Sequence, residues 1–248
     1  MNNKPHIKIL ILNWNGIGVV SNCLESVNKI SYENYSITVI DNGSVDESIK
    51  YIEQNFENIT IFENNFNYGF SKGYNNYFKY NEDNDIDYYL ILNNDTVVDN
   101  NLLTQLVNAS NYYGHDNIYS PIIKNKDQTI WYAGGKLIKS LGFTWHIGSG
   151  SIENHGLIKT KKTEYVSGCC MFIKRKIMTD LGGFNNLFNM YYEDVDLCLR
   201  AKKINSDCYV VENTYINHVV SYSSVNNAVL KKYILKSKSL IKFIFLNN

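Results

Sequence analysis

Two adjacent carboxylates, Glu193 and Asp194, stand at the start of a predicted helix in the segment FNMYYEDVDLCLRAKK, residues 188–203. The apolar side of that helix holds Asp194 together with the residues three, four and seven positions further on: Leu197, Cys198 and Ala201. Another side is predicted to be a solvated, charged face: Asp196, Arg200 and Lys203. Asp194 is therefore expected to face protein, where a carboxylate needs a partner or a chemical task. For Glu193 alone, the preference of a helix N-terminus for acidic residues is an equally good explanation.

A third carboxylate, Asp95, ends the apolar run YYLILNND (88–95) and precedes a polar turn. An aspartate in this place can hold Mg²⁺ or Mn²⁺ bridging two phosphates, because these ions accept few protein oxygens and complete their shell with phosphate and water. The alternative is that Asp95 only orders the turn into the next helix. His218 follows the last predicted strand, and an isolated histidine is more often packed or exposed than a ligand.

Polar residues recur where the predicted strands end. They form three groups: Asn13-Trp14-Asn15, Asp41-Asn42, and Asn93-Asn94-Asp95. Each group is also a plausible turn or cap, but ligands of open α/β sheets bind at the carboxyl ends of the strands. Three groups on one edge predict a polar cleft there. The segment 64–75 adds Gly69, which permits close backbone approach, and Lys72, which could meet a phosphate. A dinucleotide fingerprint is absent.

The first half of the chain alternates strand and helix patterns. Strands are predicted at 7–13, 37–42, 58–63 and 88–95, and helices follow each of them. Ser44 to Glu47 is interpreted as a capping box that opens one of these helices. The alternation implies right-handed crossovers and a mainly parallel sheet flanked by helices.

The second half is predicted to differ. Loops and short antiparallel strands are expected over 114–165, a strand at 164–174 and a last strand at 208–212. We expect one domain over 1–228, with a nucleotide-binding half (1–113) and an acceptor and catalytic half (114–228). The tail, 229–248, is predicted to be an amphipathic helix that lies on a membrane surface or on the domain itself.

The composition of the chain limits the kinds of partner and compartment that we expect for it. The 248 residues carry no net charge, so no general attraction to nucleic acid or to anionic lipid is expected. Five cysteines form no C-x-x-C pair, which favours free thiols in a reducing cytosol. No signal peptide and no run of membrane-spanning length is recognised, which favours a cytoplasmic protein.

The segments ILNWNG, VIDNGSVDES, NNFNYGFSKGYN, YYLILNNDTVVD, VSGCCMFIKRKIMTDLGGF and FNMYYEDVDLCLRAKK, in this order, resemble the family 2 glycosyltransferases. The resemblance covers about residues 7–220 and is greatest to a rhamnosyltransferase-like bacterial branch that builds cell-surface polysaccharides. It implies the GT-A fold and an inverting transfer from a nucleoside-diphosphate sugar, most simply a dTDP- or UDP-sugar, to a hydroxyl of a glycan or lipid-linked glycan. The enzyme would then work at the inner face of the plasma membrane.

The resemblance also implies roles for individual residues. Asp41 would bind the nucleobase, with Asn13, Trp14, Asn15, Asn42 and Asn94 lining that pocket, and Gly69 and Lys72 would lie by the ribose and phosphates. Asp95 would hold Mg²⁺ or Mn²⁺, with His218 and Asn93 as further ligands. Asp194 would be the general base and Glu193 would shape the acceptor site. Asn93 stands where the family pattern has an aspartate, so a single acidic residue remains there.

Two other functions fit parts of the sequence. A sugar nucleotidyltransferase also uses an α/β nucleotide site, but NWNGIGVVS lacks the basic residue expected after its first strand. A non-catalytic protein that binds sugar nucleotides or glycans on the same scaffold would be distinguished by failing to turn the donor over.

Overall fold

The computed structural model describes residues 4–152, 159–219 and 228–247. Its strands are β1 (Ile7–Asn13), β2 (Tyr35–Asp41), β3 (Ile59–Glu63), β4 (Tyr88–Asn93), β5 (Thr96–Val98), β6 (Ile118–Asn125), β7 (Ile130–Tyr132), β8 (Gly135–Ile138), β9 (Phe143–His146), β10 (Lys161–Thr163), β11 (Cys170–Lys174) and β12 (Cys208–His218). Its helices are α1 (Val20–Val27), α2 (Ser48–Asn55), α3 (Gly69–Tyr80), α4 (Leu102–Tyr113), the 3₁₀ turn η1 (Lys139–Leu141), α5 (Arg175–Asp180), α6 (Glu193–Lys203) and α7 (Ala228–Asn247).

One mixed sheet runs through both halves of the chain, in the order β10-β12-β6-β11-β4-β1-β2-β3. The four strands β3, β2, β1 and β4 are parallel, as the alternation of strands and helices predicts. β11 pairs antiparallel with β4 on one side and with β6 on the other, and this insertion joins the second half to the first. A separate two-stranded hairpin, β8–β9, lies outside the sheet.

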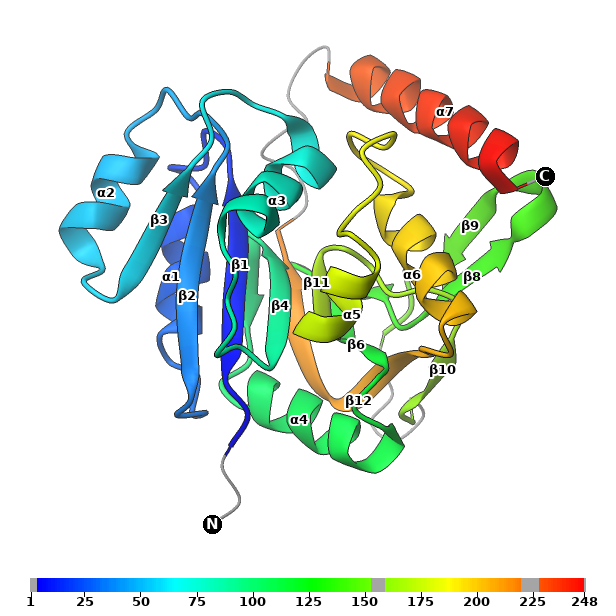
Figure 1. Cartoon of the computed structure of the whole chain (residues 1–248), viewed down its shortest axis with the longest axis horizontal. Coiled ribbons are helices and arrows are strands. Elements are labelled where there is room, and N and C mark those ends of the chain that lie inside the picture. Colours follow the sequence, from blue (N-terminus) through cyan, green and yellow to red (C-terminus); the bar gives the residue numbers. More distant parts are fainter. Residues whose placement is uncertain (1–3, 153–158, 220–227, 248) are drawn as a thin grey trace.

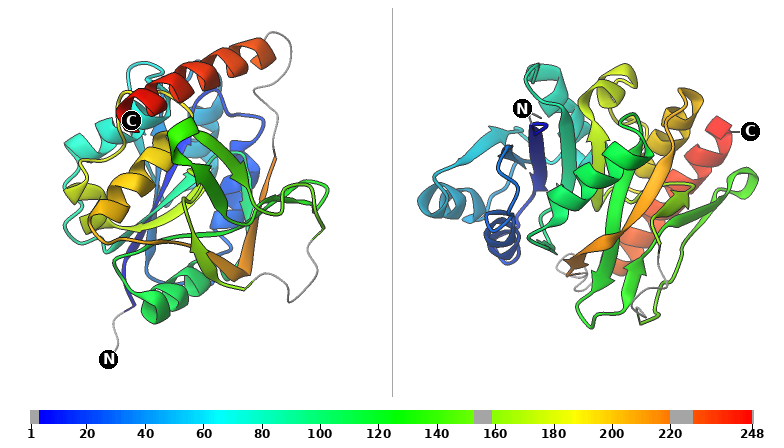
Figure 2. Two further views of the ribbon diagram at one scale, coloured as in Figure 1. Left: turned by 90° about the vertical axis from the view of Figure 1, so that its right-hand side faces the viewer. Right: turned by 90° about the horizontal axis from the view of Figure 1, so that it is seen from below.

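Helices cover both faces of this sheet. In Figures 1 and 2, α3, α5 and α6 lie over one face, and α1, α2 and α4 lie over the other. The strands in the middle of the sheet are therefore buried on both sides, which explains their continuous apolar runs, such as IKILILN in β1. The expectation of an α/β fold with a mainly parallel sheet and a small antiparallel portion is confirmed.

Three predictions about strands in the second half of the chain were wrong. The region expected to hold only loops and short strands contains β6, a strand of eight residues, seven of them buried. The strand predicted at 164–174 begins only at Cys170, because the preceding residues form a turn that enters the site. β12 continues to His218 past a register shift between Val211 and Tyr215, so the polar residues Glu212 and Asn213 interrupt its apolar pattern without ending it.

The predicted capping box is also wrong. α2 begins at Ser48, and neither Ser44 nor Glu47 caps it through a side chain. Asp46 instead accepts the backbone N–H of Ser48, while Ser44 belongs to the loop that meets Asn15.

The C-terminal segment forms the helix α7, as the sequence predicts. It packs through Phe243, which is fully buried, and through Ser239, whose hydroxyl donates to the carbonyl of Met190. Within the described residues, no helix has the length and apolar character needed to span a bilayer.

Candidate active site

The polar edge predicted from the strand ends is a connected hydrogen-bond network. Asn13 is fully buried, and its amide nitrogen lies 3.0 Å from Ser48 Oγ, 3.3 Å from Ser44 Oγ and 3.5 Å from Asp41 Oδ1. Its amide oxygen accepts from Asn94 Nδ2 at 2.8 Å. Asn13 therefore links the ends of β1, β2 and β4, and it orients the carboxylate of Asp41.

The loop after β1 lies on this network with its side chains at different depths. Asn15 adopts a left-handed conformation (φ 48°), which lets its N–H donate to Ser44 Oγ while its side-chain oxygen accepts from Val45 N. Trp14 is 52% exposed. A Cβ on Gly16 would lie 2.2 Å from Asn13 Oδ1, so this position has room only for glycine.

The side chain of Asn42 makes its hydrogen bonds to other residues of this chain. Its amide donates to Asn67 Oδ1 and to the carbonyl of Gly69, and its oxygen accepts from Asn64 Nδ2 and Tyr68 N. The structure thus places Asn42 as the support that fixes the start of α3. Gly69 has φ +77°, and a Cβ there would meet the carbonyl oxygen of Asn189 at 2.8 Å.

Lys72 lies apart from the carboxylates of the site. It is exposed on α3 and lines a groove of about 710 Å³ with residues such as Asn64, Tyr68 and Asn76. Neither Asp41 nor Asp95 lines that groove. The structure therefore brings Lys72 to the outer side of α3, beside the end of β3.

Asp95 and His218 are brought together by strand pairing. β5 pairs antiparallel with β12, which sets Thr96 opposite His218, and Val219 N donates to the Asp95 carbonyl at 2.9 Å. His218 Nε2 then lies 3.2 Å from Asp95 Oδ1. The edge of the Trp131 ring packs against His218 at 4.9 Å between centroids and limits its rotation.

The atoms of this pair fit a cation. Asp95 Oδ1 is buried and makes no hydrogen bond of regular geometry within the described residues, and the ring nitrogen that faces it is His218 Nε2. A carboxylate oxygen and an imidazole nitrogen are donors that Mn²⁺ accepts, and carboxylates suit Mg²⁺. No third His, Cys, Asp or Glu of the described part of the chain joins them, so a bound ion would complete its shell with phosphate and water. Asn93, the third predicted ligand, ends β4 two residues before Asp95.

Asp194 lies in the first turn of α6 and its two oxygens have different partners. Oδ2 accepts the N–H of Gly168 at 3.0 Å, and Oδ1 accepts the N–H of Val195 at 2.8 Å. Burial raises the pKa of this carboxyl, and these two backbone donors oppose the rise. A carboxylate with a raised pKa that is still supported in its charged form is suited to accept a proton.

Glu193 has a different environment. It is buried, 6% exposed, and its Oε2 has no hydrogen-bond partner among the described residues. Burial first and the charge of Asp194 second raise the pKa of Glu193 well above its usual value. Burial therefore favours the neutral form of Glu193, while the two backbone donors support the charged form of Asp194.

Asp95 and Asp194, the two carboxylates predicted for the site, both influence the thiol of Cys169 through their charges. Burial raises the pKa of Cys169, and the charges of Asp95 and of Asp194 add to the rise. The backbone connects them as well, because Cys169 O accepts from Asn93 N while Gly168 N donates to Asp194. The turn 167–169 thus lies between the Asp95–His218 pair and Asp194.

The predicted solvated face of α6 was wrong for Asp196 and Arg200, whereas Lys203 is exposed as predicted. Asp196 is 7% exposed and accepts from Arg200 Nε at 2.6 Å. Arg200 also donates to the carbonyls of Leu181 and Gly183, so the pair fastens the loop after α5 to α6. Helical spacing identified the i, i+4 pair, but it could not show that a loop covers it.

The sequence analysis missed the residues that set the direction of α6. Tyr191 and Tyr192 both have left-handed backbones, with φ of 69° and 71°. The Tyr192 hydroxyl donates to Gly142 O at 2.8 Å, which holds this strained turn in place. Gly168 was part of a recognised motif, yet its role as the donor to Asp194 depends on a contact 26 positions along the chain.

Comparison with known proteins supports the same family as the motifs. The family model described as "Glycosyl transferase family 2" matches residues 8–182. A hexosyltransferase of low-salt glycan biosynthesis, Agl10 of Haloferax volcanii, is 25% identical over 216 residues, which are 83% of this chain and 66% of that protein.

Solved structures support the fold. The crystal structure of GalNAc-T7 with UDP, GalNAc and Mn²⁺ has a TM-score of 0.73 at 15% identity, over 94% of this chain and 48% of that one. S. aureus TarS 1–349 in complex with UDP has a TM-score of 0.67 at 13% identity, over 98% of this chain and 65% of that one. The chain thus spans about half to two thirds of the length of these relatives.

The expected GT-A fold is therefore confirmed, while the rhamnosyltransferase-like branch stays a prediction. Since the family model covers most of the chain, including β1 to β4 and the turn that holds Asp194, the protein belongs to glycosyl transferase family 2.

Proposed function

We propose that this protein transfers a hexosyl group from a nucleoside-diphosphate sugar to a hydroxyl of a glycan or lipid-linked glycan, with inversion at the anomeric carbon. The observation that carries the proposal is the placement of the turn 167–169 between Asp194 and the Asp95–His218 pair. The relatives named above include a hexosyltransferase and structures holding UDP, which supports a sugar nucleotide as donor.

The proposed roles follow from the contacts. Asp41, oriented by Asn13, would accept from the nucleobase, and Trp14 would cover the nucleotide from the open side. Asp95 and His218 would hold Mg²⁺ or Mn²⁺, which when bound would stabilise negative charge on the leaving diphosphate. Asp194 would take the proton of the acceptor hydroxyl as its oxygen attacks the anomeric carbon. A single displacement of this kind inverts that centre and needs no covalent intermediate.

Holding donor and acceptor in line contributes as much as the base does. The hydrogen bonds from Gly168 and Val195 fix the direction of the Asp194 carboxylate, and burial favours the neutral form of Glu193 beside it. Family membership argues against the alternative of a sugar nucleotidyltransferase.

A donor screen tests the proposal. The chain would be incubated with UDP- and dTDP-hexoses and Mn²⁺ or Mg²⁺, and two signals recorded: the shift in melting temperature and the release of nucleoside diphosphate. Stabilisation by at least one donor together with release supports an enzyme, because a bound ligand raises the melting temperature by linkage. Stabilisation without release, in the presence of glycan acceptors, would support the non-catalytic binding protein instead. Retention of the anomeric configuration in the product, read by NMR, would refute the single displacement.

A further inference from the structure

The helix α7 has a second apolar face that the domain does not cover. The face toward the domain holds Phe243 and Ser239, both buried, with Leu240 and Ile244 partly buried beside them. On the opposite side, at helical spacing, stand Ile234, Ile241 and Phe245, which are 45%, 54% and 84% exposed. An outward apolar stripe on a surface helix is not explained by packing within this chain.

Exposed apolar side chains continue from α7 onto the neighbouring hairpin. Gly142, between η1 and β9, sits so close to α7 that an added Cβ would lie 2.6 Å from Leu240 Cδ1. Beside it, Leu141 is 62% exposed and Phe143 is 58% exposed. Figure 1 shows the hairpin tip against the C-terminal end of α7. Exposed apolar side chains thus lie on two adjoining elements at one end of the molecule, an arrangement typical of an interaction site.

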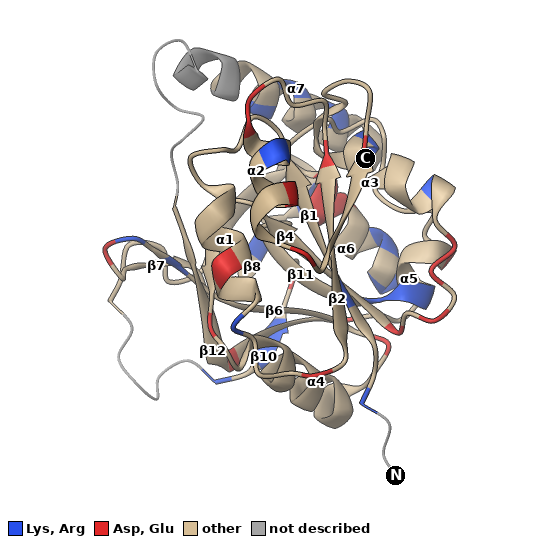
Figure 3. Ribbon diagram, turned by 90° about the vertical axis from the view of Figure 1, so that its left-hand side faces the viewer, with Lys and Arg blue, Asp and Glu red and all other residues tan. Residues whose placement is uncertain are grey.

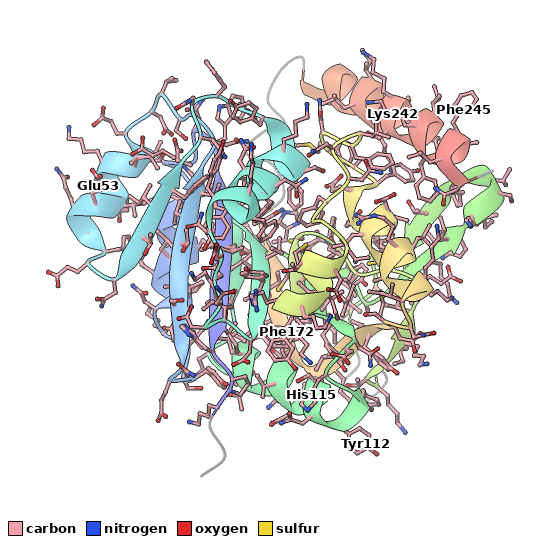
Figure 4. All side chains as sticks on the ribbon, viewed as in Figure 1. Glu53, Tyr112, His115, Phe172, Lys242 and Phe245 are labelled. Atoms are coloured by element: carbon pink, nitrogen blue, oxygen red, sulfur yellow. The ribbon has the colours of Figure 1, made fainter. Side chains whose placement is uncertain are left out.

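The charged residues described on α7 are lysines. Residues 233–247 include Lys236, Lys238 and Lys242 and neither Asp nor Glu. Lys238 lies within the outward stripe, one turn from both Ile234 and Ile241. Figure 3 shows the described turns of α7 in tan and blue, and Figure 4 shows Phe245 near the C-terminal end of the helix. Lys242 turns back to the domain, where it donates to the carbonyl of Leu187 at 2.8 Å. The hairpin adds Lys136 and Lys139, and the one acid beside them, Glu164, pairs with Lys136 at 3.9 Å.

We propose that the outer face of α7, with the adjoining η1–β9 turn, docks onto an anionic lipid bilayer, with Ile234, Ile241 and Phe245 inserted among the acyl chains and Lys238 among the headgroups. A helix with a lysine-bearing, aromatic-containing outer face and no acidic residue lies in the plane of such an interface. Lysine side chains extend along the apolar surface and keep their ammonium groups at the phosphates.

Docking here would bring the proposed acceptor side of the site to the bilayer. Tyr192, next to Glu193, packs its ring on Phe243 of α7 at 5.1 Å, and Ser239 holds the carbonyl of Met190. The turn that starts the catalytic helix therefore lies directly beneath the docking helix. The docking surface itself does not rest on the proposed transfer reaction.

Vesicle co-sedimentation of the full chain tests the proposal. The wild-type chain is expected to sediment with vesicles of equal parts phosphatidylglycerol and phosphatidylcholine, less with phosphatidylcholine alone, and less as salt is added. The double variant Ile241→Ser/Phe245→Ser should bind at least about tenfold more weakly, because two apolar side chains are lost from the interface. Lys238→Gln should weaken binding about fivefold, the value of roughly one lysine near an anionic surface.

Matched controls lie at the other end of the molecule. Tyr80 and Tyr112 are 68% and 82% exposed, and Tyr112 lies on α4, far from α7 (Figure 4). Tyr80→Ser/Tyr112→Ser should therefore bind vesicles as the wild-type chain does, as should Lys29→Gln. Circular dichroism and melting temperature confirm that each variant is folded.

Three outcomes would overturn the proposal. The first is a wild-type chain that stays in the supernatant with anionic vesicles. The second is an Ile241→Ser/Phe245→Ser variant that sediments as the wild-type chain does. The third is self-association of the wild-type chain in sedimentation velocity that the same double variant abolishes, which would make the occupant of this face a second copy of the chain. Donor turnover in solution is a separate readout, so failure of docking and failure of the transfer reaction are distinguishable.

Discussion

Replacing Asp194 by asparagine removes the proposed base while keeping the size of the side chain. General-base catalysis is worth about 10²–10⁴-fold, and each factor of ten is about 1.36 kcal/mol, so the variant should lose roughly 3–5 kcal/mol of transition-state stabilisation. Donor binding should change little, because the nucleotide is expected at Asp41 and Asp95. The assay is release of nucleoside diphosphate in the presence of acceptor, with kcat and KM determined separately.

The structure also indicates how much stability the Asp194→Asn substitution should cost. Both Asp194 oxygens accept backbone N–H groups, whereas an amide has only one oxygen and would turn its NH₂ toward the other donor. One unsatisfied N–H costs about 1–3 kcal/mol, partly offset because the charge beside Glu193 disappears. The assay temperature must therefore lie well below the melting temperature of the variant.

A neighbouring substitution separates loss of the base from loss of structure. Asp196→Asn breaks the pair with Arg200 two positions away, so it should lower the melting temperature and leave kcat near the wild-type value when the chain is folded. If Asp194→Asn keeps its rate to within about tenfold, with mass spectrometry excluding reversion by deamidation, the assignment of the base is wrong. The acid limb of kcat/KM gives a second check: since burial raises the pKa of Asp194 above 3.8, activity should fall as pH drops through that raised pKa.

Three further changes have defined outcomes. Asp95→Asn should weaken the calorimetric affinity for UDP with Mn²⁺ much more than for UDP alone, and equal losses in both titrations would remove Asp95 from the metal site. Glu193→Gln should raise the melting temperature at neutral pH: the folded state holds a proton that the unfolded state releases above about pH 4.5, so wild-type stability falls as pH rises through that range and the gain should vanish below it. A gain that persists at low pH would mean that charge is not its cause. Gly16→Ala should lower the melting temperature, because its Cβ would collide with Asn13 and Asn94, and an unchanged value would show that the loop yields without cost.

Much of the fold could be predicted because burial dictates its sequence. The runs in β1 and β4 are apolar since helices cover both faces of the sheet, and their polar ends mark the edge where Asn13, Asp41 and Asp95 gather. β6 was missed because its eight residues include Ser120, Pro121 and Lys124, which break the expected pattern. Its identity as a strand depends on β11 and β12, which lie far along the chain.

The site was predictable to the level of residue types and less so to their contacts. Helical spacing placed Asp194 toward protein, where the structure has it, but the same spacing put Asp196 in solvent. Both inferences used only the period of the helix, whereas the loop that ends in Gly183 covers one side of α6. A loop without periodicity leaves no signal of where it will lie.

The assignment of roles within the acidic pair shows what only coordinates supply. In sequence, Glu193 and Asp194 are adjacent carboxylates of nearly equal intrinsic acidity. In the structure, Asp194 receives two N–H donors while Glu193 receives none at Oε2, so burial raises the pKa of Glu193 well above its usual value, whereas the donors to Asp194 oppose the rise there. This difference depends on the N–H of Gly168, which meets Asp194 in the first turn of α6, directly after the left-handed residues Tyr191 and Tyr192. The chemistry of the pair is therefore set by backbone geometry outside the acidic motif, and a change in that turn should alter the site as surely as a change in either acid.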